Sequence, residues 1–151
     1  MIKNTETFKE DIHLLLEAGF IAINQADEDS AKKLFDASML LDDKNVLCYV
    51  GKGYVALHKL DTKNAVNMFE KALEIDPENQ MARTFLGLTQ MFIPNKVTSG
   101  EKTCMEAMKE TSDPQIKKFA ESAIEFSNTF IKKGMGGTES PMKLHKKKKE
   151  K

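Results

Sequence analysis

The segment FEKALEIDPEN at residues 69–79 decides the fold predicted for this chain. Its apolar side chains recur every three or four residues, which is the spacing of one face of an α-helix. Asp76 and Pro77 then interrupt the pattern, because proline cannot continue a helix but readily begins the next one. The segment therefore predicts a helix that ends near residue 75, followed by a turn and another helix.

The same pattern recurs at a spacing of 34 residues, most clearly at Gly19, Gly53 and Gly87. Under this shift several further residues coincide: Ala22 with Ala56, Ala31 with Ala65, Phe35 with Phe69, Asp42 with Asp76, and Asn45 with Asn79. Self-similarity at a fixed period of this length is typical of stacked repeat architectures. We therefore predict helix pairs at 12–25 with 28–41 and at 46–59 with 62–75.

Small residues are expected to hold the two helices of each pair together, because they let the backbones approach closely. The predicted contacts are Gly19 with Ala31, Gly53 with Ala65, and Gly87 with Ser99. Phe35 and Phe69 are expected to fill the space between one helix pair and the next. In the third unit, an insertion of one residue would place Gly100 and Cys104 in the equivalent positions.

These residues resemble the tetratricopeptide repeat signature, which runs here through Tyr49, Gly53, Ala65, Phe69, Ala72 and Pro77. The resemblance covers about residues 8–111. It implies an all-α fold, with three tandem helix-turn-helix repeats at about 12–45, 46–79 and 80–112 that form a right-handed superhelix.

A capping helix is predicted at 114–133, because a terminal repeat exposes an apolar face that needs cover. Asp113 and Pro114 are a strong helix start. One face of this helix would carry Ile116, Phe119, Ala120, Ala123, Ile124, Ser127, Phe130 and Ile131. We expect residues 1–133 to form one domain, and the lysine-rich segment 134–151 to be a disordered basic tail.

Charge and hydropathy exclude several classes of function. Residues 1–133 carry 17 basic and 21 acidic side chains, which makes this part a poor candidate for nucleic-acid binding. No apolar run is long enough to span a membrane, and the N-terminal segment lacks the apolar core of a signal peptide. The two cysteines have no motif spacing, so a reducing compartment is expected. The sequence thus predicts a cytoplasmic protein.

The sequence contains no motif of the residue types that form catalytic or metal sites. None of His13, His58 and His145 has a partner histidine or cysteine three or four residues further on. Acidic pairs such as Asp42 and Asp43 fall at predicted turns, where they serve as caps, and no glycine-rich phosphate loop follows a strand. We therefore expect no enzyme activity, no cofactor and no metal.

The first helices of tetratricopeptide arrays line a concave groove, and an apolar series here occupies the expected positions. The predicted groove residues are Leu16, Phe20, Ile23, Val50, Tyr54, Leu57, Leu88 and Met91, with Thr84 between them. The core side of these helices is already supplied by residues such as Leu15 and Ala18, so the series is an additional apolar stripe. It predicts a trough for an amphipathic helix or an extended apolar segment. The alternative is that an N-terminal extension or a dimer partner buries it.

The groove composition narrows the class of partner. Tetratricopeptide domains that bind the acidic tails of heat-shock chaperones place Lys, Arg and Asn along this groove, so a carboxylate clamp is not expected here. A chain of three repeats with an apolar groove resembles the tetratricopeptide-type chaperones of bacterial type III secretion systems. That resemblance implies a chaperone that sequesters a needle or translocator subunit. A small helical co-chaperone and a homodimer stay open as further partners.

Two other functions remain open at the level of sequence. A scaffold module would use the same groove to join subunits of an assembly without releasing them. An adaptor for nucleic acid or a membrane surface would instead act through Lys146–Lys149. The apolar groove favours chaperone and scaffold over the adaptor.

Overall fold

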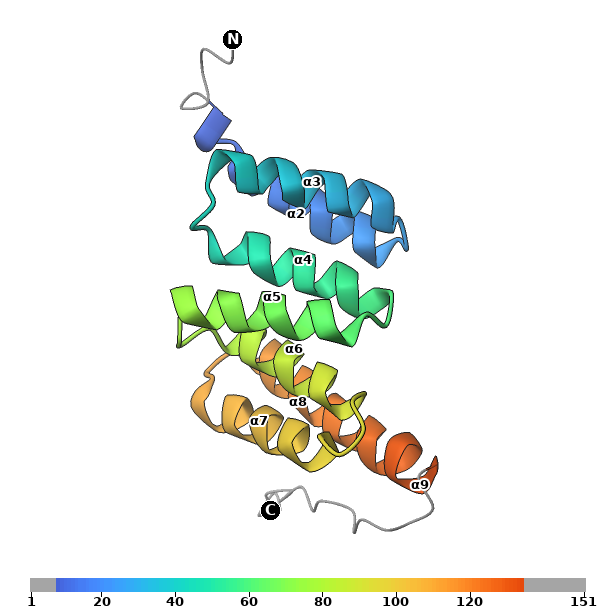
Figure 1. Ribbon diagram of the computed structural model, residues 1–151. Helices are drawn as coiled ribbons and strands as arrows, with labels where there is room; N and C mark the ends of the chain where they lie inside the picture. Colours follow the sequence, from blue (N-terminus) through green and yellow to red (C-terminus); the bar gives the residue numbers. More distant parts are fainter. Residues whose placement is uncertain (1–7, 135–151) are drawn as a thin grey trace, which may run out of the picture.

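Three helix pairs of nearly equal length follow one another in the computed structural model, which describes residues 8–134. They are α2 (Ile12–Asn24) with α3 (Glu28–Leu41), α4 (Val46–His58) with α5 (Thr62–Ile75), and α6 (Gln80–Met91) with α7 (Val97–Glu110). Figure 1 shows the pairs stacked in chain order, with α2 and α3 at one end and α7 at the other. No strand occurs within residues 8–134. The all-α repeat fold predicted from the sequence is confirmed.

Side-chain caps define where the helices begin. An Asp or Asn accepts a hydrogen bond from a backbone N–H of the first turn at five of them: Asp27 from Ser30, Asn45 from Leu47, Asp61 from Asn64, Asn79 from Ala82, and Asp113 from Gln115. Such caps satisfy N–H groups that have no partner inside the helix. The turns within the first two repeats are also alike, because Ala26 and Leu60 adopt φ angles of 61° and 55°. The following aspartate N–H then bonds back to Ala22 or Ala56 at 2.9 Å.

The phenylalanine rings, rather than the small residues of the second helices, are the nearest neighbours of the glycines. Phe35 and Phe69 are fully buried. A Cβ atom added at Gly19 would lie 2.7 Å from Phe35, and one added at Gly53 would lie 2.6 Å from Phe69. Gly51 in the next repeat also faces Phe35. Phe35 thus fills the space between successive pairs as predicted, and the phenylalanine rings lie nearer to the added Cβ atoms of Gly19 and Gly53 than Ala31 and Ala65 do.

The third repeat does use small residues at this contact. The atoms nearest a Cβ added at Gly87 are Cys104 Sγ at 2.7 Å and the Gly100 carbonyl oxygen at 2.8 Å. Ser99 is not among them, so the predicted pairing of Gly87 with Ser99 is wrong by one residue. The insertion of one residue predicted for this repeat explains the difference. Without a phenylalanine here, two backbones approach directly.

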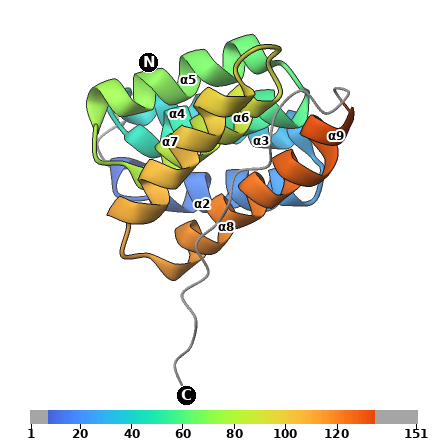
Figure 2. The same ribbon diagram turned by 90° about the horizontal axis from the view of Figure 1, so that it is seen from below.

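A further helix, α8 (Pro114–Phe126), covers the end of the array by packing on α6 and α7. It contributes Ala120, Ala123 and Ile124 to a core cluster with Met91. Seen from below, α8 lies on the side of the array where α2 lies, opposite α5 (Figure 2). Because α2, α4, α6 and α8 contact one another in sequence, α8 takes the place of the first helix of a fourth repeat. The predicted capping helix is therefore present.

The capping helix is not one continuous α-helix to residue 133. A π-helical turn, η1 (Ser127–Ile131), follows α8, and the short α9 (Lys132–Gly134) follows η1. A π turn contains more residues than an α turn, so side chains beyond it rotate away from their α-helical positions. Phe130, predicted on the packed face, is 64% exposed. That assignment is corrected.

Two sequence predictions concern residues beyond the described range. The basic tail at 134–151 lies outside it except for Gly134, and so do residues 1–7 of the predicted domain. The domain boundaries therefore stay predictions. Among the described helices, none has the length and apolar character that crossing a membrane requires.

Candidate protein-binding site

Most of the predicted groove residues belong to the core instead of an open stripe. Leu16, Ile23, Val50, Leu57, Met91 and Thr84 are buried. Phe20, Tyr54 and Leu88 are half-buried. The first helices pack on each other as well as on the second helices, so they are covered on two sides. The predicted continuous trough along α2, α4 and α6 is therefore not present. The accessible apolar surface is confined to smaller areas.

An apolar pocket of about 430 Å³ lies between α4, α6 and α8. Its walls are formed by Tyr54, Leu57, His58, Leu60, Phe85, Leu88, Phe92 and Phe119. Tyr54, Leu57 and Leu88 were predicted from the sequence as groove residues, and this pocket brings them together. The other lining residues were not part of that set. None of the lining residues is Lys, Arg, Asp or Glu.

Phe85 is the centre of an aromatic cluster at the base of the pocket. Its ring centroid lies 4.9 Å from that of Tyr54 and 5.0 Å from that of Phe119. It also stacks on Phe69 at 5.5 Å with an interplanar angle of 8°. Contacts of this kind add to the energy of burial and fix ring orientations. The pocket is thus preformed and held by side chains from α4, α5, α6 and α8.

The 34-residue shift contains a signal for Phe85 that the predicted groove set did not use. Gly51 occupies the equivalent position in the second repeat, where it makes room for Phe35. In the third repeat this glycine is replaced by a phenylalanine, whose side chain extends between Phe69 and Phe119. A further shift of 34 residues leads from Phe85 to Phe119, and α8 begins 34 residues after α6, so the same signal extends to Phe119.

One wall of the pocket carries polar groups. The Tyr54 hydroxyl donates a hydrogen bond to Asn24 Oδ1 at 3.1 Å, and the His58 ring packs edge-on against the Tyr54 ring at 4.9 Å. Burial raises the pKa of Tyr54, so its hydroxyl stays protonated and remains a donor. The pocket therefore offers an apolar base with a polar rim, which is the usual composition of a ligand pocket.

A strip of exposed phenylalanines continues from this pocket, and we call it the aromatic strip. It consists of Phe92, Phe126 and Phe130, which are 38%, 39% and 64% exposed. The ring centroids of Phe92 and Phe126 lie 6.0 Å apart, and those of Phe126 and Phe130 lie 5.2 Å apart. Phe92 belongs to both the strip and the pocket wall. Clustered exposed aromatic side chains mark interaction surfaces more often than single exposed ones do.

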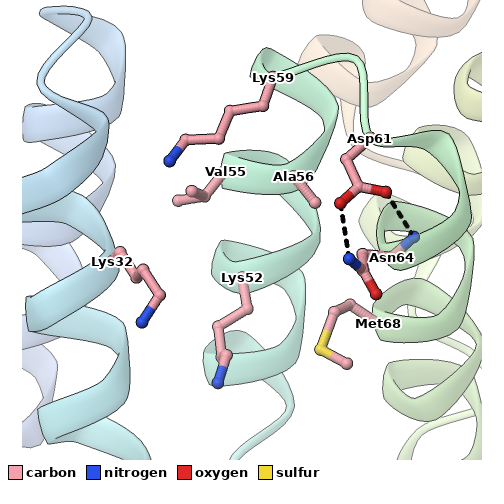
Figure 3. Close-up of a pocket in the computed structure, with 8 residues that line it drawn as sticks. All are labelled: Lys32, Lys52, Val55, Ala56, Lys59, Asp61, Asn64 and Met68. Carbon is pink, nitrogen blue, oxygen red and sulfur yellow. Dashed lines mark hydrogen bonds between the residues drawn. The ribbon is translucent and has the colours of Figure 1, made fainter.

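A second hollow of about 290 Å³ opens near α3, α4 and α5 and is lined by lysines. Figure 3 shows Lys32, Lys52 and Lys59 around it, with Asp61 and Asn64 joined by hydrogen bonds on one side. Lys32 and Lys52 both pair with Asp36, at 2.7 and 2.8 Å. Burial alone would raise the pKa of Asp36, but its hydrogen bonds with the two lysines hold that pKa below its ordinary value. Because Lys32 and Lys52 pair with Asp36, and Lys59 lies 3.9 Å from Glu28, this hollow is a poor site for an anion.

The described residues contain no arrangement suited to metal binding or thiol chemistry. No group of three or more His, Cys, Asp or Glu within residues 8–134 is placed to hold a metal ion. Cys48 and Cys104 are buried, and burial raises their pKa values to about 11 and about 12. Both thiols are therefore protonated at neutral pH and behave as small core residues.

Comparisons with known proteins agree with this architecture. Residues 47–79 match the tetratricopeptide repeat family. The N-terminal domain of stress-induced protein-1 (STI-1) from C. elegans has a similar fold, with 20% sequence identity and a TM-score of 0.57. The similarity covers 77% of this chain and 96% of that domain. No curated protein sequence matches the chain. The chain thus has a tetratricopeptide-type fold.

Proposed function

We propose that this tetratricopeptide-type protein binds an apolar segment of another protein in the pocket between α4, α6 and α8. The observation that carries the proposal is the preformed aromatic pocket centred on Phe85, with Tyr54 and Phe119 beside it. Rigid aromatic rings lose little conformational entropy on binding, and they dominate many protein interfaces.

The partner segment is proposed to be an amphipathic helix or an extended apolar strand. Its anchoring side chain would enter the pocket beside Leu88 and Tyr54, and its neighbours would lie on the aromatic strip. Binding should depend only weakly on salt, because no Lys, Arg, Asp or Glu side chain lines the pocket. A carboxylate clamp would instead require several cationic side chains at this place.

We further propose that the protein acts as a chaperone, which keeps such a segment from associating with itself. The resemblance to the chaperones of type III secretion systems suggests a needle or translocator subunit as the client. A scaffold function would use the same pocket without releasing its partner. The pocket supports a binding role for both the chaperone and the scaffold function. The two functions differ in whether the segment is released during assembly.

The test uses the partner that co-purifies with the full-length protein from its native host, titrated calorimetrically against purified variants. Tyr54→Glu places a charge in the pocket, and Phe92→Ala removes an aromatic side chain that is already partly exposed. We expect Tyr54→Glu to cost about 2 kcal/mol or more, or roughly a 30-fold loss of affinity. Lys71→Ala, on the exposed surface of α5, is the control and should bind normally.

Using two pocket variants allows a loss of binding to be distinguished from a loss of folding. Phe92→Ala should keep the melting temperature close to that of the wild type while it weakens binding. If both pocket variants retain wild-type affinity and Lys71→Ala loses it, the partner binds another face and the proposal fails.

A further inference from the structure

A buried carboxylate joins the third repeat to the end of the capping helix. Glu101 in α7 is fully buried. Its Oε1 atom accepts a hydrogen bond from the Ser127 hydroxyl at 2.8 Å, and its Oε2 atom accepts one from the Lys132 ammonium at 2.8 Å. Lys132 is only 5% exposed, so the ion pair is shielded from water. Breaking such a pair by removing one partner leaves a buried charge and is strongly destabilising.

The spacing of the two donors explains the π-helical turn. Ser127 and Lys132 are five residues apart. An α-helix turns about 100° per residue, so residues five apart would point about 140° away from each other. A π-helix bonds residue i to residue i+5 and brings such residues close to one face. The turn η1 spans Ser127–Ile131 and therefore allows both donors to reach the same carboxylate.

The apolar pattern of the same segment favours a different register. Ala120, Ala123, Ile124 and Ser127 are buried along one face of the helix. Continued as an α-helix, this face would next include Phe130 and Ile131, three and four residues after Ser127. In the observed register Phe130 is 64% exposed instead. Two registers thus compete, one that buries Phe130 and one that pairs Lys132 with Glu101.

We propose that Glu101 is a positioning residue that selects the π register, and that it thereby displays Phe130 on the aromatic strip. In the α register Lys132 would turn toward solvent and Phe130 would pack against α7, so the strip would lose its most exposed ring. This role for the aromatic strip rests on the proposed function. The occupant of the strip is the apolar face of the partner segment that binds in the pocket. The strip is continuous with the pocket through Phe92, which lies 6.0 Å from Phe126.

The test is spectroscopic and needs no client. The chain contains no tryptophan, so Phe130→Trp introduces a single fluorophore at the position that distinguishes the registers. In the full-length protein we expect this tryptophan to emit at long wavelength and to be quenched readily by acrylamide. Adding Glu101→Met should shift its emission to shorter wavelength and lower its quenching severalfold, because Lys132 can then leave the core while residue 130 enters it.

Three further variants separate register selection from a merely structural role. Lys132→Met should lower the melting temperature far more than Glu101→Met, since it leaves the Glu101 carboxylate buried without its cation. Glu106→Met, at an exposed glutamate of α7, is the matched control and should leave the tryptophan exposed. Deleting Thr129 places Lys132 four residues after Ser127, a spacing that an α-helix brings to one face, so this variant should keep wild-type stability.

The proposal is overturned if the tryptophan introduced by Phe130→Trp stays exposed when a folded protein also carries Glu101→Met. It is also overturned if deletion of Thr129 destabilises the protein as much as Lys132→Met does. Neither outcome would bear on the pocket, whose binding role is tested separately by Tyr54→Glu and Phe92→Ala.

Discussion

Replacing Gly53 by alanine sets two effects of opposite sign against each other. Alanine stabilises a helix interior by about 0.5–1 kcal/mol relative to glycine. The new Cβ atom, however, would lie 2.6 Å from Phe69 Cε1 and 2.8 Å from its Cζ. Phe69 is fully buried and stacked on Phe85, so its ring cannot move aside without disturbing the base of the pocket. Overpacking of this kind costs about 1–3 kcal/mol.

The net expectation is that Gly53→Ala destabilises the protein by about 1–2 kcal/mol. Each kcal/mol lowers the melting temperature by roughly 2–4 °C. Urea denaturation followed by far-ultraviolet circular dichroism measures this difference. Gly134→Ala is the matched control, because no atom lies within 4 Å of its added Cβ, and it should be neutral or slightly stabilising. Gly53→Ala combined with Phe69→Leu should destabilise less than the sum of the two single changes. A Gly53→Ala variant as stable as the wild type would refute the close packing of Gly53 on Phe69.

Phe35→Ala should lower the free energy of unfolding by about 3–5 kcal/mol in urea titrations, because it empties a fully buried site between two repeats; a change below about 1 kcal/mol would contradict that packing. At pH 8 the thiols of Cys48 and Cys104, with pKa values of about 11 and about 12, should react with a disulfide reagent only after denaturation. Rapid reaction of either thiol in the folded protein would show that the core opens there. Deleting residues 135–151 should leave the melting temperature unchanged in a thermal scan, since the sequence of this segment offers little to bury. A large drop would mean that the tail packs on the repeats.

The helices could be predicted from the sequence because their boundaries are local. Asp76 and Pro77 end a helix by backbone chemistry, and the 34-residue shift transfers that boundary to the other repeats. Thus the predicted helix at 62–75 is observed at Thr62–Ile75. The cap at Asp113 was equally visible, because aspartate is a favoured N-cap and proline is favoured at the first helical position.

The site was harder to predict because it depends on contacts between repeats. Burial of Ile23 and Val50 follows from the packing of the first helices on one another, which no single helix reveals. The docking of α8 brings Phe119 to Phe85 and completes the pocket. The exposure of Phe130 depends on an ion pair between α7 and α9, and therefore on residues 31 positions apart. Helical periodicity alone places Phe130 on the wrong side.

The measurement that tests the central claim most directly is photo-cross-linking of the full-length protein in its native host. A photoreactive phenylalanine analogue would replace Phe92, which is already aromatic and 38% exposed at the edge of the pocket. The same analogue at Lys71, on the exposed surface of α5, is the control. The proposed function predicts that position 92 cross-links to an apolar stretch of one partner protein and that position 71 does not. Cross-links from position 71 to the partner, with none from position 92, would contradict it.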